Sequence, residues 1–84
     1  MSLIKYVEQK NRWRALFGEP ELDIRNAKDR QQIARMIDAD LSPENLTCDG
    51  ELSRSQVQQR YSQLTRAARD LQRVDPSVKF YEFA

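Results

Sequence analysis

Residues 53–74 read SRSQVQQRYSQLTRAARDLQRV, and this stretch decides the fold. Its apolar side chains recur at spacings of four, three, four and three residues, at Val57, Tyr61, Leu64, Ala68 and Leu71. At about 100° per residue, these side chains lie within about 40° of one line along an α-helix. We therefore expect one long amphipathic helix, and we call its apolar line the seam. The seam must be covered by other helices of the chain, by a second copy, or by both.

Both ends of this predicted helix carry recognisable signals. Ser53 precedes the first turn and Gln56 follows three residues later, which is the pattern of a capping box. At the other end Asp75 precedes Pro76, and a residue before proline is disfavoured in the helical region. These signals set the predicted bounds at 53–74.

The segment just before it, LSPENL at residues 41–46, predicts a further helix start. Ser42 fits the N-cap position, Pro43 fits the first helical position, and Leu41 and Leu46 fit a hydrophobic staple. This pattern indicates an extra short helical turn at 43–48. A calcium loop over residues 38–49 is the competing interpretation, but Pro43 stands where such a loop needs glycine. We therefore interpret the acidic residues of this segment as solvated carboxylates.

Residues 2–17 and 23–40 form two further predicted helices. Ser2 and Asp23 are the expected N-caps, and Gly18 followed by Pro20 ends the first helix. Trp13 is expected to pack in the core or at its rim, because tryptophan mostly serves packing. The apolar residues at helical spacing are Leu3, Tyr6, Val7, Trp13 and Phe17 in the first helix and Ile33, Met36, Ile37 and Leu41 in the second.

The predicted fold class is mostly all-α. It is a small three-helix domain spanning residues 1–84, with the extra turn at 43–48 and a short extended C-terminal tail at 78–83. The tail contains Phe80, Tyr81 and Phe83, and a short strand and an extended arm both fit its composition. Three aromatic residues so close together are expected to be buried, within the chain or against another copy. A domain of 84 residues has a marginal core, which dimerisation commonly supplements.

The charges of the chain nearly balance, with 14 Lys and Arg against 13 Asp and Glu and a net charge of +1. This balance gives no long-range attraction to nucleic acid or membrane and little repulsion between copies. No apolar run approaches the roughly 18 residues that span a bilayer. Lys5 interrupts the apolar pair that would begin a signal peptide. We expect a cytoplasmic location and no membrane partner.

The sequence offers little for catalysis. It has no histidine, which removes the commonest general base and the commonest transition-metal ligand. The single cysteine, Cys48, has acidic neighbours rather than the cations that stabilise a thiolate, so we expect it to be a buried or half-buried small residue. Two glycines cannot form a phosphate-binding loop. We expect no enzymatic activity, no cofactor and no metal.

These observations favour a small non-catalytic protein-interaction module, either self-associating as a homodimer or binding another protein. The long helix and the tail supply the apolar surface for such contacts. The predicted interface consists of Val57, Tyr61, Leu64, Ala68, Leu71, Phe80, Tyr81 and Phe83.

Nucleic-acid binding is the alternative. Arg66, Arg69 and Arg73 lie opposite the seam, and we call this row the arginine ridge. Such a ridge can hold a phosphate backbone or an acidic partner, but a solvated face with cations near the helix C-terminus is the favoured interpretation, because exposed rows of charge are common. Residues 43–59 also have the outline of a helix-turn-helix, with Arg54 and Gln58 suited to base edges. Five acids between residues 38 and 51 would repel phosphates, so this alternative ranks second.

Overall fold

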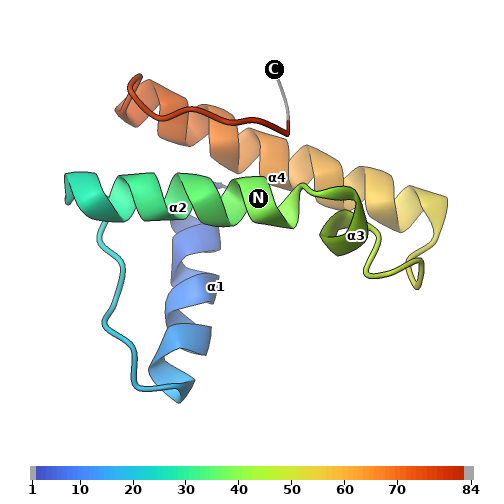
Figure 1. Cartoon of the computed structure of the whole chain (residues 1–84), viewed down its shortest axis with the longest axis horizontal. Coiled ribbons are helices and arrows are strands. Elements are labelled where there is room, and N and C mark those ends of the chain that lie inside the picture. Colours follow the sequence, from blue (N-terminus) through green and yellow to red (C-terminus); the bar gives the residue numbers. More distant parts are fainter. Residues whose placement is uncertain (1, 83–84) are drawn as a thin grey trace.

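The computed structural model describes residues 2–82. Within this range the chain forms α1 (Leu3–Leu16), α2 (Ala27–Asp40), α3 (Pro43–Leu46) and α4 (Arg54–Val74), and no strand. Helices α2 and α4 pack together, and α1 meets α4 at a steep angle through its N-terminal half (Figure 1). The C-terminal half of α1 extends away from the other helices (Figure 1). The predicted helical fold, with its short extra helix, is confirmed.

One hydrophobic core joins the three long helices. Ile33, Ile37 and Leu71 are completely buried, and each such side chain stabilises the fold by about 1.5–3 kcal/mol relative to an exposed one. Ala67 and Ala68 are also completely buried, and their small side chains allow neighbouring helices to approach α4 closely. The remaining core residues are Leu3, Tyr6, Val7, Leu22, Ala34, Leu41, Leu64 and Val78.

The start of α4 confirms the capping box. Ser53 Oγ accepts a hydrogen bond from the Gln56 backbone N–H at 3.3 Å, and Gln56 Oε1 accepts one from the Ser53 N–H at 2.9 Å. A cap of this kind stabilises a helix by about 1 kcal/mol. At its other end α4 stops at Val74, and Asp75 before the proline is the C-cap residue, as predicted.

The predicted N-cap of the second helix is wrong by three residues. Helix α2 begins at Ala27 with Asn26 as its N-cap, and Asn26 Oδ1 accepts from the N–H groups of Lys28 and Asp29. The expected cap, Asp23, instead accepts from the Arg25 N–H in a turn outside the helix. Residues 23–26 lie outside the helix. The neighbouring Leu22 is hydrogen-bonded to Asn11 of α1, which keeps this part of the chain extended.

Helix α3 is real, but Ser42 does not cap it in the expected way. The Ser42 hydroxyl donates to the carbonyl oxygen of Ala39 instead of accepting from the helix. After α3 the backbone turns through three successive left-handed residues, Cys48, Asp49 and Gly50. Cys48 is exposed, so the expectation that it is buried or half-buried is wrong.

The tail lies as an extended arm across the helices. Val78 is buried and Phe80 packs against the core, while Asp38 Oδ1 of α2 accepts the backbone N–H groups of Tyr81 and Glu82 at 3.0 and 2.9 Å. Tyr81 is 85% exposed, so the expectation that the tail aromatics are buried is wrong for this residue. Phe83 lies outside the described residues.

Candidate functional site

Most of the seam lies inside the chain itself. Leu64, Ala68 and Leu71 are buried against α1, α2 and the tail. Val57 is half-buried and Tyr61 is 41% exposed, so the free part of the seam is its N-terminal end. Of the predicted protein interface, the exposed residues within the described range are therefore Tyr61 and Tyr81.

A larger exposed apolar surface lies at the end of α1. Trp13, Leu16 and Phe17 are 60%, 74% and 75% exposed, and we call these three residues the apolar tip. At about 200 Å² for a large side chain, they present roughly 400 Å² of apolar surface. Patches of this size on a monomer are often functional. The expectation that Trp13 packs into the core is therefore wrong.

The course of the α1–α2 connection explains why the apolar tip is uncovered. The Asn11 side chain pairs with both backbone groups of Leu22: its amide nitrogen donates to the carbonyl oxygen at 3.0 Å, and its oxygen accepts from the N–H at 2.8 Å. Asn11 and Trp13 are two residues apart and so point to nearly opposite sides of α1. The connection covers the Asn11 side and leaves the Trp13 side free.

The apolar tip is held in place by the turn that ends α1. The N–H of Gly18 donates to the Ala15 carbonyl and that of Glu19 to the Arg14 carbonyl, which is the Schellman pattern, and Gly18 takes the positive φ it requires. The Arg14 side chain donates to the Pro20 carbonyl at 2.9 Å and pairs with Glu19 at 3.0 Å. Phe17 is thus presented by an ordered turn.

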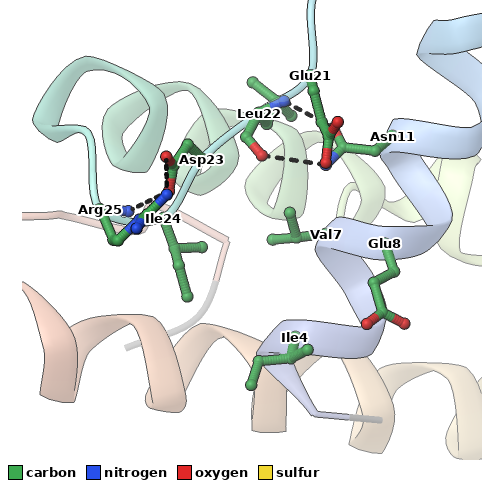
Figure 2. A pocket seen from close by; sticks show the side chains of 9 residues that line it. All are labelled: Ile4, Val7, Glu8, Asn11, Glu21, Leu22, Asp23, Ile24 and Arg25. Atoms are coloured by element: carbon green, nitrogen blue, oxygen red, sulfur yellow. Dashed lines mark hydrogen bonds and ion pairs between the residues drawn. The ribbon is translucent and has the colours of Figure 1, made fainter.

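A groove lies on the other side of α1, between this helix and residues 21–25 (Figure 2). It has a volume of about 470 Å³, an apolar floor that includes Val7 and Leu22, and acidic side chains at its rim, among them Glu8 and Glu21. Asp23 is also at the rim, where the side chain and backbone N–H of Arg25 hold its carboxyl pKa below the usual value. The sequence did not predict this groove, because its outer wall follows from the Asn11–Leu22 pairing.

The arginine ridge is exposed, as expected from its position opposite the seam. Arg66, Arg69 and Arg73 all face solvent on α4. Arg73 lies 3.5 Å from Asp70, whereas the other two make no ion pair with any residue from 2 to 82. Asp70 is also the acceptor of the Leu3 N–H at 3.3 Å, so it ties the start of α1 to α4.

A polar cluster fills the corner between α1, α2 and α4. Asp40 Oδ2 accepts from the Tyr6 hydroxyl at 2.7 Å and lies 3.0 Å from Lys10 Nζ. Burial, together with the Asp40 hydrogen bond and charge, raises the pKa of the Tyr6 phenol well above its usual value. A phenol held in this way stays protonated and is a structural hydrogen-bond donor.

No metal site, membrane-spanning helix or similar known protein identifies a further functional feature in the described residues. Residues 2–82 contain no group of three His, Cys, Asp or Glu side chains that could hold a metal ion. None of the helices in that range is long and apolar enough to cross a membrane. Comparison of the chain with protein-family models, curated proteins and solved structures gives no match.

Proposed function

We propose that this chain is a small non-catalytic protein-interaction module that associates with a second copy of itself through the apolar tip. The observation that carries the proposal is the exposure of Trp13, Leu16 and Phe17 on the half of α1 that extends from the core. An ordered turn presents these side chains, so little entropy is lost when they become buried in a complex.

Charge and area favour a second copy as the occupant. The net charge of +1 gives little repulsion between copies. Two apolar tips in contact would bury roughly 800 Å², which lies at the weak, reversible end of protein interfaces. A hollow of about 280 Å³ beside Trp13, lined also by Gln9, Arg12 and Leu16, offers each copy a place for a side chain of the other. The proposal is therefore a two-fold symmetric dimer that dissociates on dilution.

Trp13 makes this proposal easy to test, because it is the only tryptophan. We expect sedimentation velocity to show a dimer at high protein concentration, and the tryptophan emission to shift to shorter wavelength over the same range. Leu16→Asp places a charge in the interface at an exposed position, so the variant should fold normally and remain monomeric. Tyr81→Ala is the control, since it removes an exposed aromatic side chain of the tail, which Asp38 of α2 holds, and leaves the apolar tip intact.

Two results would contradict self-association through the tip. One is a wild-type chain that stays monomeric at the highest concentration reached. The other is a Leu16→Asp variant that is folded by circular dichroism and dimerises as the wild type does.

The second candidate function is nucleic-acid binding by the arginine ridge, and the two unpaired cations of that ridge, Arg66 and Arg69, support it. For duplex DNA, the slope of log affinity against log salt should fall by about 0.9 for every phosphate that the protein no longer neutralises. Titration of a labelled duplex with the wild type and with the Arg66→Ala, Arg69→Ala, Arg73→Ala triple variant tests this. Equal binding by both proteins would remove the ridge from consideration.

A further inference from the structure

Arg60 carries a buried donor that has no acceptor. The residue lies on α4 where that helix meets α1, and its Nε–H is shielded from solvent without a hydrogen-bond partner among residues 2–82. Buried N–H groups are nearly always paired, because an unpaired donor loses its water without compensation. Arg60 also makes no ion pair with a carboxylate in the described part of the chain. Among residues 2–82, its Nε–H therefore lacks an acceptor, and no carboxylate lies within ion-pair distance of its guanidinium.

Arg60 lines a small, partly open cavity where α1, α2 and α4 meet. This cavity has a volume of about 70 Å³, and its polar walls come from Tyr6, Gln9, Lys10, Asp40, Arg60 and Gln63. A water molecule in the liquid occupies about 30 Å³, so the cavity has room for about two water molecules or for one small polar group of similar volume. Its walls are mostly polar, so it is not a dry packing defect.

The charges around the cavity leave an excess of +1. Lys10 and Arg60 supply two positive charges, and Asp40 supplies one negative charge that is already engaged by the Tyr6 hydroxyl at 2.7 Å and by Lys10 Nζ at 3.0 Å. The Arg60 charge reaches the same place, because it opposes the rise in the Tyr6 phenol pKa. The side-chain amides of Gln9 and Gln63 are further donors that no described residue engages.

We propose that this cavity is a binding site for a carboxylate group. A carboxylate has two oxygens that can accept from Arg60 Nε–H and from a neighbouring amide or ammonium group at once, and its single negative charge balances the excess. A water molecule could accept from Arg60 Nε–H but would not balance the excess positive charge of the cavity. A dianionic phosphate would leave a net charge of −1 in the cavity and would be repelled by Asp40 more strongly than a carboxylate. The carboxylate comes either from a small free acid or from an Asp or Glu side chain of a second copy of the chain. Only the second case rests on association through the apolar tip.

The test follows the Nε–Hε resonance of Arg60 by ¹⁵N–¹H NMR spectroscopy. Sodium acetate is titrated against sodium chloride at equal ionic strength, with the Hε of exposed Arg66 as the internal control. We expect the Arg60 resonance to shift saturably with acetate and much less with chloride. Arg60→Lys keeps the charge but removes Nε–H, and it assigns the resonance, while Arg66→Lys should leave the acetate response unchanged.

The outcomes separate the two sources of the carboxylate. A shift with acetate at fixed protein concentration supports a free-acid site. A shift that appears with rising protein concentration alone, and is absent in Leu16→Asp, supports a carboxylate from a second copy. The proposal is overturned if the Arg60 resonance responds to acetate no more than that of Arg66, or equally to chloride, and also does not shift with protein concentration. The acetate response does not depend on whether the wild type dimerises through the apolar tip.

Discussion

Asn11 fixes the course of the chain between α1 and α2, and its removal tests how the loop is held. Asn11→Ala deletes both hydrogen bonds to Leu22, which is buried and would keep two backbone groups without partners. At about 0.5–1.5 kcal/mol for each bond, we expect a loss of about 2 kcal/mol in the free energy of unfolding. For a domain of this size that corresponds to a fall of about 10 °C in Tm.

Urea unfolding followed by circular dichroism measures this loss, with an unchanged m-value showing that the native state is otherwise intact. Asn11→Asp sharpens the test. The carboxylate of this variant can still accept from the Leu22 N–H but repels the Leu22 carbonyl oxygen. We therefore expect the variant to be less stable than the wild type at neutral pH and to regain part of that stability in mild acid, where the protonated carboxyl can donate. Asn45→Ala, which loses one exposed hydrogen bond, is the control and should cost well under half as much. A loss below about 0.5 kcal/mol for Asn11→Ala would refute the role given to the pairing.

Three further outcomes are expected. Leu71→Ala empties a completely buried position and should cost about 2–5 kcal/mol in chemical denaturation. The Ser77 and Arg30 side chains lower the Asp75 pKa from 3.8 to about 2. The stability that this carboxylate contributes is therefore present above pH 4 and lost toward pH 2. We expect Asp75→Asn to reduce the fall in the free energy of unfolding over this pH range. Cys48→Gly relieves a positive φ at an exposed position and should raise Tm slightly, whereas an unchanged or lower Tm would contradict strain there.

Local signals in the sequence were sufficient to predict α4. The capping box at Ser53 and the regular spacing of the seam both lie within α4, so they can be recognised without knowing any contact with the rest of the chain. The start of α2 could not be predicted in the same way. Asp23 is a good N-cap residue by type, but the pairing of Asn11 with Leu22 spans 11 residues and draws its neighbours into an extended path. Short-range rules carry no information about such a contact.

The same limit applies to the candidate site. Helical spacing placed Trp13 and Phe17 with Leu3, Tyr6 and Val7, but it cannot tell how far along α1 the core extends. Trp13, Leu16 and Phe17 are exposed because the C-terminal end of α1 extends away from α2 and α4 (Figure 1). The cavity beside Arg60 depends on three helices meeting, so no stretch of the sequence by itself indicates it.

The bond between Leu3 and Asp70 joins positions 67 residues apart, and this separation affects how the chain folds. Helix α1 precedes α2 and α3 in the chain, and the part of α4 that covers α1 follows them. Closing this loop costs more entropy than closing the shorter loops among α2, α3 and α4, so we expect α1 to dock late in refolding. We expect Val7→Ala to accelerate unfolding while leaving the folding rate nearly unchanged in stopped-flow measurements. A folding rate that falls in proportion to the lost stability would place α1 in the folding nucleus instead.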